Sequence, residues 1–135
     1  MDEEQIVSLA TQLVELEYYR YRRYRVDFSV VLIYSEIATL FELVAGQIRR
    51  TDIVQQVAHN VTCLAYTHTD ITGAHTATQK LCEKLAGQLG DPTLRAGLSA
   101  VRPGDEEAEV LVIRALNALK ESRSVTESGC NIRWA

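Results

Sequence analysis

The sequence predicts an α/β fold, a ferredoxin-like βαββαβ sandwich with an extra N-terminal helix and a C-terminal helix plus short strand. The apolar, β-branched run Phe28–Tyr34 is typical of a strand buried on both faces. Further strand-like runs alternate with amphipathic stretches of helical period. Two of these runs are separated only by His59 and Asn60, which predicts a central hairpin. This order predicts a sheet with helices on one face.

Composition limits the class of protein. The 135 residues correspond to about one domain, and 47% hydrophobic with 24% charged residues is ordinary for a globular chain. A net charge of −4 argues against a nucleic-acid-binding domain. We expect neither membrane insertion nor a signal peptide, because no apolar run is long enough and Met1–Glu4 is acidic. Cys63, Cys82 and Cys130 form no metal-binding or disulfide pattern, so we expect no cofactor, no metal and a reducing cytoplasm.

Residues 1–25 are predicted to form an amphipathic helix that packs on, or extends from, a domain of residues 26–135. An apolar stripe at helical spacing supports this helix over residues 2–22, and a short dimer seam is the alternative to packing. Residues 18–25 alternate Tyr and Arg, which suits either base stacking or a basic helix end; in an acidic chain the helix end is favoured. The interface residues predicted for a homodimer are Leu9, Leu13, Leu16, Tyr18, Tyr21 and Arg22.

The later elements follow from caps, turns and periodicity. Ser35 is expected to start a helix because it precedes an amphipathic stretch. Asp70 is a good start and Gly90 a good end for another helix. The expected ranges are a helix over 35–50, strands over 53–58 and 61–67, a helix over 70–89, a strand over 93–101, a helix from 105 or 106 to about 122, and an edge strand over 131–134.

Two stretches around the hairpin carry a family pattern. Arg49–Val54 is followed at the expected spacing by Cys63–Ala74, which contains Thr-Asp-Ile-Thr-Gly-Ala. Together they resemble the R-x-S-D-L-V and T-D-L-x-G-A motifs of GGDEF domains, the catalytic domains of bacterial diguanylate cyclases. Weaker matches extend the resemblance to about residues 15–134: Arg22–Tyr24, Phe28–Ile33, Arg95–Ser99, Ala115–Lys120 and Gly129–Ile132. The resemblance implies the nucleotide-cyclase palm fold and a place in cyclic di-GMP signalling.

The family's catalytic residues are replaced in this sequence. The GGDEF signature falls on Ala58–Thr62, so that Asn60 and Val61 occupy the metal-binding and catalytic positions. The family's other metal-binding aspartate falls on Tyr34, and the segment that reads guanine is too short. Phosphoryl transfer needs metal ions held by carboxylates. The resemblance therefore implies a degenerate domain without enzymatic activity, acting as a regulatory or scaffolding module through protein–protein contacts, expected as a homodimer.

A second function is left open by the R-x-x-D pattern of Arg49 and Asp52. In the family this pattern is an inhibitory site for cyclic di-GMP, and Arg50 is a further candidate ligand. The alternative function is therefore a cyclic di-GMP effector. The plain alternative is that Asp52 begins a strand turn and Arg49 is a solvated charge. His68 and Asp70 belong to a polar loop rather than a metal site, because no complete ligand set is present.

Overall fold

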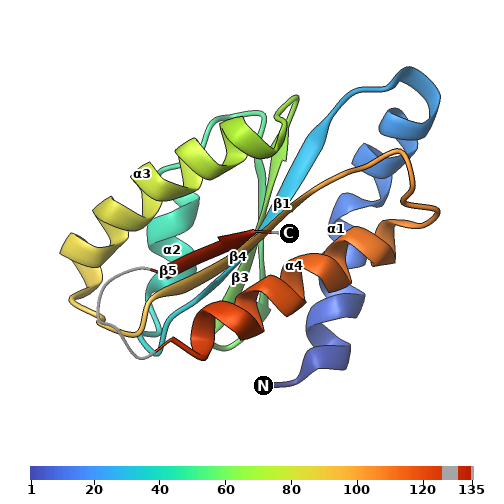
Figure 1. Cartoon of the computed structure of the whole chain (residues 1–135). Coiled ribbons are helices and arrows are strands. Elements are labelled where there is room, and N and C mark those ends of the chain that lie inside the picture. The colour runs from blue at the N-terminus through green and yellow to red at the C-terminus, as the bar shows by residue number, and fades with distance from the viewer. Residues whose placement is uncertain (126–130, 135) are drawn as a thin grey trace.

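The computed structural model describes residues 1–125 and 131–134. Its helices are α1 (Glu3–Tyr24), α2 (Leu40–Ala45), α3 (Ile71–Leu89) and α4 (Ala108–Arg123). Its strands are β1 (Phe28–Tyr34), β2 (Ile53–Ala58), β3 (Val61–Thr67), β4 (Arg95–Ala100) and β5 (Asn131–Trp134). These strands form one sheet in the order β2-β3-β1-β4-β5 (Figure 1). All neighbouring pairs are antiparallel except β4 and β5.

The predicted α/β class is confirmed, including the extra N-terminal helix and the C-terminal helix followed by a strand. Strand β1 lies at the centre of the sheet, and all seven of its residues are buried. This is the outcome expected of an uninterrupted apolar run, since such a strand has no solvent-facing side. The hairpin of β2 and β3 turns at His59 and Asn60, as predicted.

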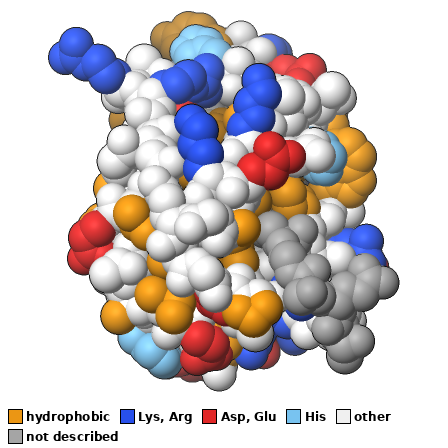
Figure 2. All heavy atoms as spheres, turned by 90° about the vertical axis from the view of Figure 1, so that its left-hand side faces the viewer, with side chains coloured by type: hydrophobic (Ala, Val, Ile, Leu, Met, Phe, Trp, Pro, Cys, Tyr) orange, Lys and Arg blue, Asp and Glu red, His pale blue; other side chains and the backbone are white. Residues whose placement is uncertain are grey.

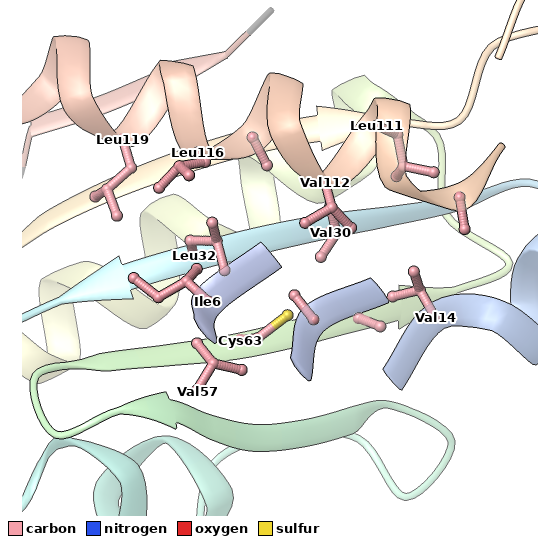
Figure 3. Packing of buried hydrophobic residues seen from close by; sticks show 14 of the residues in the cluster. Ile6, Val14, Val30, Leu32, Val57, Cys63, Leu111, Val112, Leu116 and Leu119 are labelled. Atoms are coloured by element: carbon pink, nitrogen blue, oxygen red, sulfur yellow. The ribbon is translucent and has the colours of Figure 1, made fainter. Parts of the chain in front are cut away.

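Both faces of the sheet are covered, so the expectation of helices on one face is wrong for the whole molecule. Helices α2 and α3, which belong to the βαββαβ unit, pack on the face that includes Val31 and Ile33. The additional helices α1 and α4 pack on the opposite face, against Val30 and Leu32 (Figures 1 and 3). The alternation of strand side chains supplies an apolar surface to each pair of helices.

The helix predicted over residues 35–50 is wrong in extent, because α2 is limited to Leu40–Ala45. Ser35 is buried and its hydroxyl donates to Asp91 Oδ2, while the Glu36 amide donates to the same oxygen. The Ile37 amide donates back to the Ser35 hydroxyl at 3.1 Å. These bonds hold the chain after β1 in a turn, which competes with helical hydrogen bonding.

Other boundaries differ less. Strand β4 is shorter at both ends than the predicted 93–101, and α4 begins at Ala108 rather than at 105 or 106. The later start of α4 follows from the Asp105 carboxylate, which accepts the Arg102 amide and closes a turn instead of capping the helix. Asp70 does cap α3, accepting the Gly73 amide at 2.8 Å. Predicted boundaries therefore hold where the capping side chain has no distant partner.

Helix α1 packs along the sheet through a stripe of residues next to Leu9, Leu13 and Leu16 on the helix surface. Its buried residues are Ile6, Ala10, Val14, Glu17 and Tyr21. Figure 3 shows Ile6 and Val14 directed toward the strands, beneath the α4 side chains. α1 is thus part of the core on this face, and its leucines lie to one side of the buried stripe.

Candidate functional site

One end of the sheet holds the positions that the resemblance associates with catalysis. The strand registers align five residues, one from each strand, in a row across the sheet: Ala58, Val61, Tyr34, Arg95 and Asn131. Directly opposite residues in neighbouring strands present their side chains to the same face. This row therefore includes Tyr34 and Val61, two of the positions at which the resemblance implies metal-binding or catalytic carboxylates.

Along the row, the residues from Ala58 to Tyr34 are largely apolar, and the next residue, Arg95, is a cation. Tyr34 is 5% exposed and Val61 is 1% exposed, and both pack in the α1–α4 face of the core. The Arg123 guanidinium lies over the Tyr34 ring, 4.1 Å from its centroid, which is a close cation–π contact. Arg95 is buried and donates to the backbone carbonyls of Leu94 and Val125.

Asn60 lies in the hairpin turn beside this row. Its backbone carbonyl accepts the Ser35 amide at 3.1 Å, which ties the hairpin to the end of β1. Within residues 1–125 and 131–134, no three His, Cys, Asp or Glu side chains are grouped so as to hold a metal ion. Magnesium prefers oxygen ligands, chiefly carboxylates. The residues of the row do not fit a magnesium ion, because the charged one among them, Arg95, is a cation.

The proposed ligand pair Arg49 and Asp52 is closed on itself. The Arg49 guanidinium donates two bonds to the carboxylate, at 3.0 Å from Nε and 2.8 Å from an Nη atom. It also donates to the Thr67 carbonyl and the Thr69 hydroxyl, both at 3.0 Å. The hydrogen bond with Asp52 raises the pKa of Arg49, against a lowering by partial burial. The pair thus fastens the turn before β2 to the end of β3.

The two members of this pair differ in exposure. The Asp52 side chain is 2% exposed, whereas that of Arg49 is 57% exposed. A ligand could reach Arg49 without disturbing the fold, but could reach Asp52 only by displacing the arginine. Arg50 is exposed beside them. Asp52 therefore holds the turn before β2, which is the alternative to ligand binding given above. Arg49 is more than a solvated charge, because it pairs with Asp52.

The predicted interface residues on α1 are distributed over different sides of the helix. Leu9 and Leu13 are partly buried against the core, and Leu16 is 58% exposed. Tyr21 is 4% exposed, so its side chain is not available to a partner. Tyr18 donates to the Asp105 carbonyl at 2.7 Å and ties α1 to the turn before α4. The interface prediction itself remains a proposal, now without Tyr21.

A groove between α1 and α4 was not predicted from the sequence. It is a hollow of about 650 Å³, floored by apolar side chains that include Val7, Ile113 and Leu116. A second hollow continues it past Tyr18 and Tyr19. Six glutamates line the two hollows: Glu3, Glu4, Glu15, Glu106, Glu107 and Glu109. No Lys or Arg lines either hollow within the described chain.

The sequence contains a partial signal for this groove. Glu106, Glu107 and Glu109 look like ordinary first-turn acids, as do Glu3 and Glu4. Their gathering on one surface depends on α1 and α4 packing side by side, where Lys120 and Glu3 form an ion pair of 3.1 Å.

The side of the molecule seen in Figure 2 differs from the acidic groove. Lys and Arg side chains gather over its upper part, and apolar side chains lie in small separate areas.

Comparisons with known proteins agree on the fold. No protein-family model matches this sequence, and no curated protein matches it. Among solved structures, the chain is similar to the active GGEEF domain of a diguanylate cyclase from Vibrio cholerae, with TM-score 0.77 and 16% identity over 93% of this chain and 95% of that one. It is similar to the GGDEF domain of DgcB from Caulobacter crescentus in complex with c-di-GMP, with TM-score 0.77 and 9% identity over 94% and 89% of the two chains.

A third similar structure is the FimX GGDEF domain from Pseudomonas aeruginosa, with TM-score 0.67 and 12% identity over 94% of this chain and 88% of that chain. The chain therefore has the GGDEF-type cyclase palm fold, as the motifs around the hairpin suggest. In the described part of the chain, no helix has the length and apolar character needed to cross a membrane.

Proposed function

We propose that this chain is a catalytically inactive GGDEF-like module that regulates or scaffolds other proteins through direct contacts in the cytoplasm. The observation that carries the proposal is the row at the sheet end. The three central positions of the row hold a buried valine, a buried tyrosine and a buried arginine, and the Arg123 guanidinium lies over the Tyr34 ring. A magnesium-bound triphosphate needs carboxylates at such a place, because the cations must be anchored before they can neutralise phosphate charge.

The direct test is turnover. Purified protein is incubated with GTP and either magnesium or manganese, and products are separated by liquid chromatography and mass spectrometry. We expect no cyclic dinucleotide and no linear dinucleotide above the level of a protein-free sample. Formation of either product, in proportion to protein concentration, would contradict the proposal. An active diguanylate cyclase in the same buffer serves as the positive control.

A second candidate function is binding of cyclic di-GMP at Arg49, as an effector. The observation that favours it is the 57% exposure of the Arg49 side chain, which leaves part of the guanidinium accessible. Arginine suits both phosphate and the guanine edge. The observation against it is that the Asp52 carboxylate already accepts a bidentate arginine. Binding would then depend on Arg49 and Arg50 more than on Asp52.

Calorimetric titration with cyclic di-GMP tests this candidate. The effector function predicts saturable binding that is lost in Arg49→Ala, weakened in Arg50→Ala and unchanged in Lys84→Ala, which removes an exposed cation on α3. A flat titration of the wild-type chain rules it out. A signal that survives Arg49→Ala places the ligand elsewhere.

A further inference from the structure

The groove lies between two helices that run in opposite directions. At one end, Lys120 near the end of α4 pairs with Glu3 at the start of α1. At the other end, the hydroxyl of Tyr18, near the end of α1, donates to the backbone carbonyl of Asp105, which precedes α4. Between these two contacts α1 rises by about 22 Å, or about four turns. The two hollows follow this length, so the groove is long enough to hold a helix of similar length from another molecule.

The glutamates of the groove gather toward its two ends. Glu4 lies at the end near the start of α1. Glu15 and Glu109 line both hollows toward the other end, where Glu106 and Glu107 also lie. Within residues 1–125 and 131–134, none of these five carboxylates is in an ion pair. The negative charge of the groove is therefore not balanced by the described part of the chain.

The stability of the two helices does not explain this acidic lining. The macrodipole favours Glu4 and Glu109, which lie in the first turns of α1 and α4, but not Glu15, which lies in the middle of α1. Glu107 is at the N-cap of α4, yet its side chain forms no capping hydrogen bond. The contacts at the two ends set the helices in a register that brings Glu15 nearly level with Glu109. Like charges side by side are unfavourable, and a cation between them would remove the cost.

The middle of the groove is uncharged. It is lined by Val7, Ser8 and Thr11 from α1 and by Ile113 and Leu116 from α4. Leu116 is buried, but Ile113 is 39% exposed, so part of the apolar floor is accessible. Exposed apolar area rimmed by charge is typical of an interaction surface. The groove thus has an apolar middle between two acidic ends.

We propose that the groove binds a basic amphipathic helix of another protein, with cations at both ends of its binding face and apolar residues between them; this inference rests on the proposed function and gives the chemistry of its partner. Burial of the apolar face of a helix in a groove is a common mode of recognition. Glu4 and Glu15 are about 17 Å apart along α1, which equals about three turns of a helix. The partner therefore carries Lys or Arg about eleven residues apart, with apolar side chains at helical spacing between them. The end beside Glu15 and Glu109 takes more than one cation, because most of the glutamates lie there.

This chain's own α1 does not have the required charge pattern. Its cations begin only at Arg20, and Glu3, Glu4 and Glu15 precede them. A second copy of α1 in the groove would bring these acids against the glutamates already there, and like charges in contact disfavour association. Charge complementarity therefore favours a helix from a different protein.

Binding of a synthetic peptide, measured by fluorescence anisotropy, tests the proposal. The probe is a fluorescein-labelled helical peptide with one arginine, then leucine and alanine at helical spacing, then a cluster of arginines. The comparison peptide has the same composition but places its arginines in the middle. We expect saturable binding of the probe and at least about tenfold weaker binding of the comparison peptide. Binding of the probe should weaken at high salt, because salt screens exposed charges.

Variants of the chain locate the binding site. Glu15→Lys together with Glu109→Lys should weaken binding of the probe at least about tenfold, because repulsion replaces attraction. Ser8→Trp fills the hollow without a change of charge and should weaken binding to a similar degree. Glu83→Lys is the control, since this exposed residue of α3 lies on the opposite face of the sheet, and it should leave binding unchanged. Circular dichroism confirms that each variant is folded.

Other outcomes overturn the proposal. Equal binding of the two peptides would show only a general attraction of basic peptides to an acidic chain. A probe that does not bind, or that binds Ser8→Trp as tightly as the wild-type chain, would show that the groove is not the site. Sedimentation velocity tests the other occupant: a dimer that Ser8→Trp dissociates would mean that a second copy fills the groove. These results are independent of the absence of catalysis in the proposed function, which fails if the chain turns over GTP.

Discussion

The charged side chains of the sheet end and those of the α1–α4 surface differ in whether they have partners within the chain. At the sheet end, Arg95 donates to backbone carbonyls and Arg123 lies on the Tyr34 ring, so each cation is satisfied within the chain. On the α1–α4 surface, Glu4 and Glu15 line a groove without an ion pair among the described residues. A surface whose groups are satisfied internally has little to offer a ligand. The difference favours the proposed function, in which this chain acts through contacts rather than through chemistry at the sheet end.

The largest effect is expected from removing a satisfied charge. Asp105 is 3% exposed and forms a bidentate pair with Arg114 at 2.8 Å, and Arg114 also donates to Ser99 and to the Ala100 carbonyl. Asp105→Ala leaves this guanidinium without its carboxylate, which costs about 3–5 kcal/mol of unfolding free energy. Urea unfolding measures the loss.

The neighbouring Glu106 provides the matched control, since it is exposed and lines the groove. Glu106→Ala should change the unfolding free energy by less than about 0.5 kcal/mol. If the two variants lose similar stability, the distinction between satisfied and unsatisfied charges is wrong.

Restoring a catalytic carboxylate at the sheet end is the next largest change. Val61→Glu places an ionisable group at a site that is 1% exposed and surrounded by apolar side chains, so we expect a loss of about 3 kcal/mol and no cyclase activity. Asn60→Asp should cost less, because residue 60 lies in a half-buried turn, but it should still destabilise, because Asn60 Oδ1 is buried without a hydrogen-bond partner among the described residues. Thermal unfolding and the GTP assay measure both effects. A stable, active double variant would show that the sheet end is a site lacking only its carboxylates.

A smaller loss is expected where α4 lies on β4. A Cβ atom at Gly97 would collide with the Leu119 amide nitrogen and the Ala115 carbonyl oxygen of α4, so Gly97→Ala must push helix and strand apart. Overpacking of this kind costs at least about 2 kcal/mol. At Gly87 in α3 a Cβ would meet nothing within 4 Å, and Gly87→Ala should raise stability by about 0.5–1 kcal/mol. Denaturant titration of both variants checks the pair.

Much of the sheet could be predicted because its signals are local. The bounds of β1, β2 and β3 agree with the predicted ranges, since each is a short apolar run between turn residues. The end of α3 was predictable for the same reason: Gly90 adopts a left-handed conformation, with φ of 63°. Cys63 and Cys82 are buried, on β3 and α3, while Cys130 lies outside the described residues. Burial raises the pKa of Cys63 to about 12, which makes it a poor nucleophile.

The remaining features depend on contacts between residues distant in sequence. Ser35 has the sequence context of a helix cap, but Asp91 engages it, and no local pattern shows that contact. The R-x-x-D pair was predicted as a ligand site from its spacing, and that prediction stays a proposal. The hydrogen bonds that Arg49 donates to Thr67 and Thr69 depend on the position of β3, and no local pattern shows them. An apolar stripe was predicted for α1 from its spacing, but its buried residues are Ile6, Ala10, Val14, Glu17 and Tyr21, a stripe next to the leucines. Periodicity shows that a helix has an apolar face without fixing its rotation to within one residue.

The smallest effect is a dependence of stability on acid. Burial is the largest single influence and would raise the pKa of Asp105, but the hydrogen bonds from Arg114 and from the Arg102 amide, together with the positive charges of these two arginines, outweigh it and hold the pKa below the ordinary value of 3.8. Asp91 is similar, since hydrogen bonds from Ser35 and Thr93 outweigh burial and lower its pKa. A carboxyl with a lowered pKa in the folded state stabilises the fold fully above its unfolded pKa, and loses that contribution as pH falls through the folded value.

Stability of the wild-type chain should therefore be level from neutral pH to about pH 5 as far as these two groups are concerned, and decline below about pH 4. Asp105→Asn, which cannot titrate, should start lower and decline less over the same interval. Urea unfolding at each pH measures both slopes, and equal slopes would mean that the Asp105–Arg114 pair does not shift the titration of Asp105.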